Sequence, residues 1–135
     1  MKALGIIGFS VFLIAFASCK KVIKPTLIIT VVDSVGVRLE NARVYTHPCL
    51  DGVSCSDPER VNINFAKSGL TNAAGQITWE YPYSAIIDVA AQWTACDTPT
   101  TYCLSAGQTV ARFESKKLKK DETNEYNVEV IVYDL

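Results

Sequence analysis

Residues 71–81, Thr-Asn-Ala-Ala-Gly-Gln-Ile-Thr-Trp-Glu-Tyr, contain the clearest structural signal in the chain. Asn72 can accept backbone N–H groups at the start of a turn, and Gly75 can adopt the positive φ that closes it. In the run that follows, apolar residues alternate with polar ones, as expected for a strand with one buried face. The stretch therefore predicts a β-hairpin whose second strand packs on a core. The residues on the predicted inward face are Ile77, Trp79 and Tyr81.

Short runs rich in β-branched and aromatic residues recur on both sides of this hairpin. The first of them is nearly all apolar, which predicts a central strand covered on both faces. No helical period is present after residue 20. The pattern predicts a mainly β fold, a seven-stranded antiparallel two-sheet sandwich. The predicted strands are residues 26–33, 42–46, 64–70, 76–81, 86–93, 109–114 and 125–133.

The segment between the last two predicted strands is rich in lysine. Residues 116–122 read Lys-Lys-Leu-Lys-Lys-Asp-Glu. We expect a solvated hairpin tip, and the alternative is a basic docking site for an acidic partner. The acid pair directly after the lysines favours the solvated tip.

The N-terminus has the pattern of an export signal. Met1-Lys2 is followed by an apolar run over residues 3–15 and then by Phe16-Ala17-Ser18-Cys19. The run is too short to span a bilayer as a helix, and small residues precede the expected break. This pattern predicts an exported precursor.

Phe16-Ala17-Ser18-Cys19 resembles the lipobox of bacterial lipoproteins. The resemblance implies a signal peptide over residues 1–18 and a diacylglycerol on Cys19, with an acylated amine (palmitate) after cleavage. Residues 19–25 would be a lipidated tether to the membrane, and 26–135 the β-sandwich domain. Lys20 after the cysteine favours the outer membrane over the inner one and leaves the leaflet open. The alternative is an ordinary signal peptide cut elsewhere, with Cys19 a spare thiol.

Four further cysteines fall into two close pairs, each in a polar, turn-rich segment. An exported protein is expected to hold them as disulfides. The simplest of the three possible connectivities pairs Cys49 with Cys55 and Cys96 with Cys103, and the sequence does not decide among them. His47 and the cysteines after it also allow a zinc site, and Asp51 with Asp57 a calcium site, but neither spacing is that of a dedicated site. The predicted disulfide cysteines are Cys49, Cys55, Cys96 and Cys103.

Three phrases along the chain resemble prealbumin-like sandwich modules, a group that includes the carboxypeptidase regulatory-like domain and the collagen-adhesin B-type repeat. They are residues 29–36, 39–44 and 69–77. The resemblance covers roughly residues 26–93 and implies a sandwich in which Ala42 and Val44 enter the core. Such modules are frequently accessory parts of larger surface systems.

The residue inventory argues against catalysis. The chain has one histidine, so it cannot supply the histidine-rich sites of the hydrolases and dioxygenases that resemble this sandwich. It also has no glycine-rich phosphate loop and no nucleophile elbow. No cofactor or metal is expected. Without Lys2, twelve basic residues face fourteen acidic ones and form no long stripe of one sign, so nucleic acid is not an expected partner.

The sequence therefore predicts a lipid-anchored, nonenzymatic binding or assembly module of the cell envelope, with an envelope protein or glycan as partner. The two cysteine loops are its candidate contact surfaces, because a pinned loop binds with less ordering cost. Carbohydrate binding by exposed aromatics is the alternative. Alternation places both tryptophans among the inward residues, which favours core packing. The aromatic candidates are Trp79, Tyr81, Tyr83 and Trp93.

Overall fold

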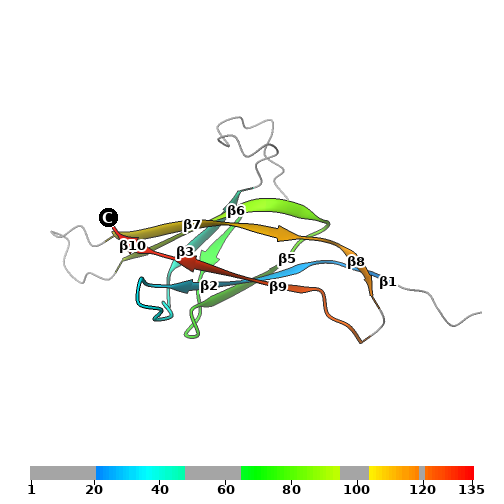
Figure 1. Ribbon diagram of the computed structural model, residues 1–135, viewed down its shortest axis with the longest axis horizontal. Helices are drawn as coiled ribbons and strands as arrows, with labels where there is room; N and C mark the ends of the chain where they lie inside the picture. Colours follow the sequence, from blue (N-terminus) through cyan, green and yellow to red (C-terminus); the bar gives the residue numbers. More distant parts are fainter. Residues whose placement is uncertain (1–20, 48–64, 95–103, 119–120) are drawn as a thin grey trace, which may run out of the picture.

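The computed structural model describes residues 21–47, 65–94, 104–118 and 121–135, and these ranges contain ten β-strands and no helix (Figure 1). The prediction of a mainly β fold is confirmed, and the predicted count of seven strands is wrong. The strands are β1 (Lys21–Ile23), β2 (Thr26–Val32), β3 (Arg43–His47), β4 (Lys67–Leu70), β5 (Gln76–Glu80), β6 (Ala85–Thr94), β7 (Leu104–Phe113), β8 (Lys116–Leu118), β9 (Glu125–Ile131) and β10 (Tyr133–Asp134).

The strands form a five-stranded sheet, a three-stranded sheet and a two-stranded ribbon. Their orders are β10-β7-β6-β3-β4, β5-β2-β9 and β1-β8. All pairs between strands are antiparallel except β2 with β9, which is parallel. The expectation of a purely antiparallel sandwich is therefore wrong at this pair. The chain can place β9 parallel to β2 because the long excursion through β3 to β8 separates them, as parallel pairing requires.

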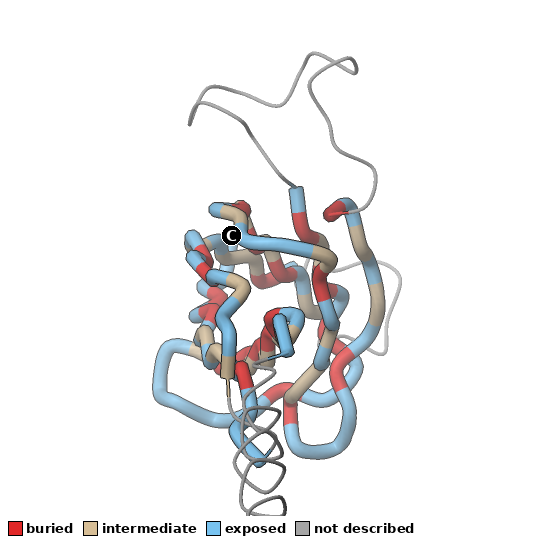
Figure 2. Tube along the Cα trace, turned by 90° about the vertical axis from the view of Figure 1, so that its right-hand side faces the viewer, coloured by how far each residue is buried: buried red, intermediate tan, exposed pale blue. Residues whose placement is uncertain are grey.

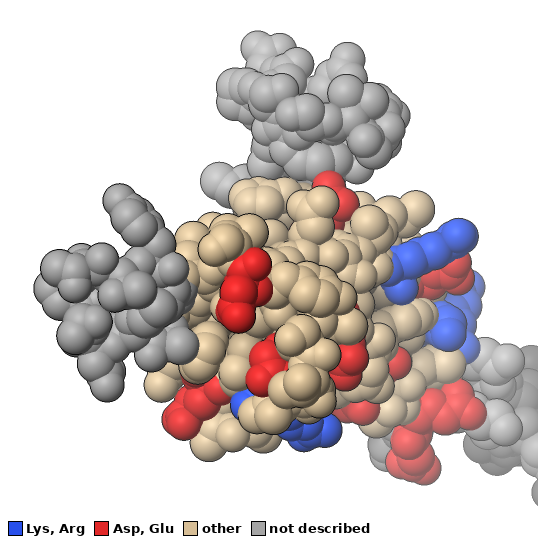
Figure 3. Space-filling view, turned by 60° about the vertical axis from the view of Figure 1, so that its left-hand side comes forward, with Lys and Arg blue, Asp and Glu red and all other residues tan. Residues whose placement is uncertain are grey.

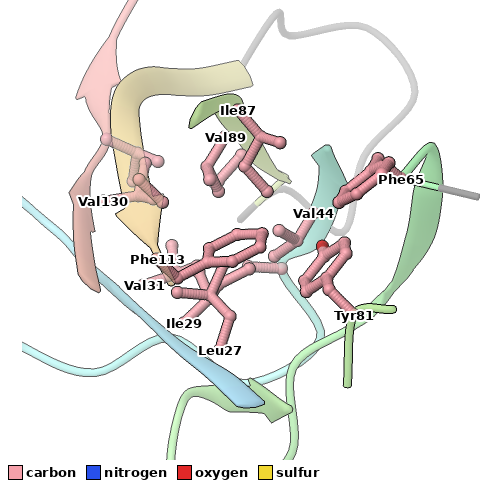
Figure 4. Close-up of a cluster of buried hydrophobic side chains, with 14 of the residues drawn as sticks. Leu27, Ile29, Val31, Val44, Phe65, Tyr81, Ile87, Val89, Phe113 and Val130 are labelled. Carbon is pink, nitrogen blue, oxygen red and sulfur yellow. The ribbon is translucent and has the colours of Figure 1, made fainter. Parts of the chain in front are cut away.

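The five- and three-stranded sheets pack face to face around one hydrophobic core. Leu27, Ile29 and Val31 of β2 meet inward residues of β6 and β7 there, and Figure 4 shows the labelled side chains of the two sheets pointing toward one another. Buried residues alternate with exposed ones along the strands (Figure 2). The period-2 pattern of the sequence thus assigns most side chains to the correct face.

The middle of the core is aromatic. Tyr81 and Phe113 lie with ring centroids 4.7 Å apart, and Phe65 stacks on Tyr81 at 5.6 Å. All three rings are buried. Such contacts between large rings add to the free energy of burial and fix the distance between the sheets.

The 71–81 hairpin has the predicted turn chemistry. Asn72 Oδ1 accepts hydrogen bonds from the N–H groups of Ala74 at 2.9 Å and Gln76 at 3.0 Å. Gly75 has a φ of 69°, which the turn requires. An analogous turn follows β2, where Asp33 Oδ1 accepts from Val35 and Val37.

Several elements differ from the sequence-based expectation. β7 begins at Leu104 rather than at residue 109, and the last predicted strand is divided into β9 and β10. Lys116–Leu118, expected in a solvated tip, forms β8 instead. The outer face of β2, expected to be covered, is half-buried at Thr26, Ile28 and Thr30.

β10 continues the chain of β9 but belongs to the other sheet. The chain leaves β2 after Ile131, and Tyr133 pairs with Ala106 of β7. Where it crosses, its backbone passes over Gly107, on which a Cβ would lie 2.8 Å from the carbonyl carbon of Ile131. Gly107 therefore permits the close approach that closes this side of the sandwich.

Two buried threonine hydroxyls connect loops to the core. Thr46 Oγ1 donates to Phe65 O at 2.7 Å and accepts from Lys67 N and from the Tyr81 hydroxyl, each at 3.1 Å. Thr71 Oγ1 donates to Leu39 O and accepts from the N–H of Ala42. Each hydroxyl satisfies backbone groups that would otherwise be buried without partners.

Burial raises the pKa of Tyr81 to about 12, against a smaller lowering by the hydrogen bond with Thr46. An unfolded tyrosine ionises near pH 10, so between pH about 10 and about 12 the unfolded state binds fewer protons than the folded one. The contribution of the neutral Tyr81 to the free energy of unfolding is therefore fully present below pH 10, and it is lost as the pH rises to about 12. In urea titrations at a series of alkaline pH values, we expect Tyr81→Phe to remove this part of the pH slope. If the free energy of unfolding of Tyr81→Phe fell with pH as steeply as that of the native chain, Tyr81 would not be the source of this pH dependence.

No helix within the described ranges has both the length and the hydropathy that crossing a bilayer requires.

Candidate functional site

The outer face of the five-stranded sheet is the candidate site. We define the outer face as the side chains of β3, β4, β6, β7 and β10 that point away from the core. At its centre, Tyr45 of β3, Ala90 of β6 and Gln108 of β7 are register partners in one row. Tyr45 and Ala90 are half-buried and Gln108 is exposed. Because Ala90 has only a methyl side chain, the longer side chains of Tyr45 and Gln108 extend beyond it on either side.

The rows on either side combine polar and apolar groups. His47, Asp88 and Val110 form one row, and the other runs from Arg43 through Gln92 and Ala106 to Tyr133. The β-strand period requires all of these side chains to share the face of Tyr45. The outer face thus offers amide, carboxylate, guanidinium and imidazole groups among apolar ones.

Exposed apolar residues concentrate on this face. Leu70, Ile86, Val110 and Tyr133 are each more than half exposed, and Leu104 is also exposed. On the opposite face of the sandwich, Ile131 is the one large hydrophobic residue of the described part of the three-stranded sheet with comparable exposure. That face carries mostly threonine and other polar residues, among them Thr78, Asn127 and Glu129. The two outer faces therefore differ in chemical character.

Tyr45 and His47 stand side by side on β3. Their ring centroids are 6.5 Å apart, with ring planes at 12° to each other. The two residues alternate with Val44 and Thr46, which are buried. Alternation thus fixes the direction of both rings. The sequence signal for this pair was the polar–apolar period of residues 43–47, but only the sheet order places it beside β6 and β7.

Three of the four aromatic candidates for sugar binding pack in or against the core. Tyr81 is buried, and Trp79 and Trp93 are half-buried and pack against the core. Trp93 Nε1 donates a hydrogen bond to Glu40 O at 3.1 Å. The expectation that the tryptophans pack in the core is confirmed. Tyr83 is 49% exposed and lies edge-on to Phe65.

The other predicted site residues lie outside the described residues. They are Cys19, the disulfide candidates Cys49, Cys55, Cys96 and Cys103, and the calcium candidates Asp51 and Asp57. Of the zinc candidates, only His47 is described, and it is exposed opposite Asp88. The described ranges contain no group of three or more histidine, cysteine, aspartate or glutamate residues placed to hold a metal ion.

Charges of both signs are dispersed over the face in Figure 3, where uncharged atoms occupy most of the surface. Two ion pairs, Lys24 with Glu80 at 3.6 Å and Arg112 with Glu114 at 3.4 Å, join exposed side chains. Exposed pairs of this kind contribute little to stability. On the visible face there is no continuous basic stripe of the sort that nucleic acid requires.

No family model matches the chain, and no curated protein matches it. Among solved structures, it is similar to a protein of Pseudomonas aeruginosa proposed to bind carbohydrate, with 10% identity and a TM-score of 0.45 over 82% of this chain and 89% of that one. It is also similar to the dioxygenase domain of a dioxygenase–carbohydrate-binding protein fusion from Streptomyces sp. SirexAA-E, with 14% identity and a TM-score of 0.44 over 84% and 82%.

A third similar structure is (S)-allantoin synthase, with 15% identity and a TM-score of 0.43 over 82% of this chain and 43% of that one. At these TM-scores the similarities carry no argument about what the protein does.

Proposed function

We propose that the protein is a lipid-anchored, nonenzymatic module of the bacterial envelope that binds a partner through the outer face of its five-stranded sheet. The difference between the two outer faces carries this proposal. A sheet face that only meets water needs no exposed Leu70, Ile86, Val110 and Tyr133, and exposed apolar side chains that share one face with polar residues are typical of interaction surfaces.

The fold is proposed to be prealbumin-like. The three phrases that carry the resemblance correspond to β2 with its turn, to the entry into β3, and to the β4–β5 hairpin. Ala42 and Val44 are buried, as the resemblance implies. The sandwich arrangement around them supports this assignment.

The anchor is proposed to be the acylated Cys19, in the outer membrane in preference to the inner one. Cys19→Ser is expected to remove the acyl mass from the mature N-terminal peptide, to block cleavage after Ser18 and to abolish lipid-dependent partitioning into detergent. Mass spectrometry of the N-terminal peptide and phase partitioning measure these effects. Unchanged mass and partitioning in the variant would refute the anchor.

The binding face is tested by site-specific photocrosslinking in the intact envelope. A photoreactive residue at Gln108, on the outer face, is expected to capture one stoichiometric envelope partner. The matched control is the same residue at Glu129, on the outward side of β9 in the other sheet. Equal capture at both positions, or none at Gln108, contradicts the assignment of the face.

Carbohydrate binding on the same face is the second candidate. It is favoured by Tyr45, which stands among Gln92, Gln108 and Arg43, since amide and guanidinium groups pair with sugar hydroxyls. Retention of the protein on a glycan array is expected to fall about tenfold or more in Tyr45→Ala and to be unchanged in Tyr83→Ala. Retention that is absent in the native protein, or unaffected by Tyr45→Ala, eliminates this candidate.

A further inference from the structure

The β1–β8 ribbon joins two lysine-rich segments that lie far apart in the sequence. Lys21, Val22 and Ile23 pair with Leu118, Lys117 and Lys116, respectively. The ribbon lies at the opposite end of the molecule's long axis from the C-terminus (Figure 1). One end of the domain is thus built from the residues next to the predicted lipid anchor and from the chain between β7 and β9.

β1 is fixed to the body of the domain. The buried Asn124 donates from Nδ2 to Ile23 O at 3.1 Å and to Glu114 O at 2.8 Å. Its backbone carbonyl accepts from the N–H of Thr26 at 2.9 Å, and Pro25, between β1 and β2 in the chain, is buried. Within the predicted tether of residues 19–25, the stretch from Lys21 to Pro25 is therefore attached to the body of the domain.

The length of chain between the predicted anchor and the ribbon is very short. Cys19 precedes Lys21 by two residues, so their Cα atoms are at most about 7 Å apart. An acylated Cys19 sits at the surface of the bilayer. The ribbon must then lie beside the lipid headgroups, and the domain has little freedom to turn away.

The chemistry of the ribbon fits anionic headgroups. Lys21 and Lys117 are exposed and have no ion pair among the described residues, and Val22, the register partner of Lys117, is 54% exposed. Lys116 Nζ lies 5.2 Å from the centre of the Tyr126 ring. Lysines near an anionic surface are attracted to it, and an exposed apolar residue can enter the interface. The acidic residues that flank β8 in the sequence, Glu114, Asp121 and Glu122, lie outside the strand, and Glu114 pairs with Arg112.

We propose that the β1–β8 ribbon, which carries Val22 and Lys117 on one face and Lys21 and Lys116 on the other, is a membrane-contact surface that seats the domain on anionic phospholipid headgroups. This inference rests on the proposed acylation of Cys19. It gives the lysines of β8 a role that their sequence position alone does not suggest. It also orients the domain, with the C-terminal end directed away from the bilayer.

The test is lysine footprinting of the acylated protein in vesicles that contain phosphatidylglycerol. Rates of amine acylation are measured by mass spectrometry for Lys116 and Lys117, with Lys67 of β4 as an internal reference. Arg38→Lys adds a reporter amine in the turn after β2. The comparison protein carries a Gly-Ser insert of about 20 residues between Lys20 and Lys21, which spans about 25 Å and keeps the lipid.

In the native chain the rates for Lys116 and Lys117, relative to Lys67, are expected to be about threefold or more below those of the insert variant. The reporter amine introduced by Arg38→Lys is expected to label equally in both proteins. Protection is expected to weaken when phosphatidylglycerol is replaced by phosphatidylcholine.

The outcomes separate this inference from the proposed function. An N-terminal peptide without acyl mass overturns the anchor and, with it, the membrane-contact surface. An acylated chain whose Lys116 and Lys117 label as fast as in the insert variant overturns the surface alone. Protection that is equal in anionic and zwitterionic vesicles overturns the preference for anionic headgroups.

Discussion

Gly107→Ala is expected to destabilise the domain by about 3 kcal/mol or more, the largest effect of a methyl group added to any glycine in the described ranges. The new Cβ would meet the carbonyl group of Ile131 and come within 3.2 Å of the Cα atom of Val132. These are backbone atoms of the segment that crosses between the sheets, so no side-chain rotation can relieve the contact. Either β10 separates from β7 or the crossing segment shifts away from β2.

Urea unfolding followed by tryptophan fluorescence measures this effect, because Trp93 lies on β6 beside β7. Gln108→Ala is the matched control, since it changes the next residue of the same strand on the exposed side and is expected to alter stability by less than about 0.5 kcal/mol. If Gly107→Ala unfolds at the same urea concentration as the native chain, the crossing segment does not pack on β7 as described.

Thr46→Val is expected to cost about 2–4 kcal/mol although the two side chains have nearly the same shape. The hydroxyl it removes bonds Phe65 O, Lys67 N and the Tyr81 hydroxyl. Thr46, Phe65 and Tyr81 are buried and the Lys67 amide is partly buried, so these polar groups would lose a partner where water has little access. The cost is therefore the desolvation of groups left unpaired rather than a loss of apolar contact.

Thr46→Ser keeps the hydroxyl and loses one methyl group, so its expected cost is about 1 kcal/mol. Adding Tyr81→Phe to Thr46→Val removes one of the unpaired groups and should recover part of the loss, giving a coupling that a double-mutant cycle measures. Equal costs for Thr46→Val and Thr46→Ser would show that the hydroxyl contributes nothing to the network.

Much of the local structure could be predicted because it depends on neighbouring residues. Asn72 and Gly75 impose their turn through their own backbone preferences and side-chain bonds. Alternation placed Ile77, Trp79 and Trp93 with the core residues. These assignments need only the strand period and the existence of one buried face.

The candidate binding face could not be predicted from the sequence because it is made by strand order. Tyr45, Gln108 and Tyr133 come from three separated segments, and their approach depends on β3 pairing with β6 and on β7 lying between β6 and β10. The sequence of each segment alone indicates only that one of its residues points outward. The conspicuous Trp79 and Trp93 lie elsewhere and pack against the core.

The start of β7 was missed for a related reason. Residues 104–108, Leu-Ser-Ala-Gly-Gln, have low β propensity, and glycine usually weakens a strand. Here Gly107 is needed because the crossing segment, Ile131 and Val132, approaches its backbone from much later in the chain. A residue that is unfavourable locally is therefore favourable in the folded sandwich.

The sequence by itself determined the mainly β character, the 71–81 hairpin and the inward and outward faces of most strands, because strand period and turn chemistry act over a few residues. Only the tertiary structure decided the parallel pairing of β2 with β9, the passage of the chain over Gly107 and the pairing of Lys21–Ile23 with Lys116–Leu118. Those features arise from packing two sheets around one core. Which distant segments pair there depends on the whole fold, and no local sequence pattern specifies it.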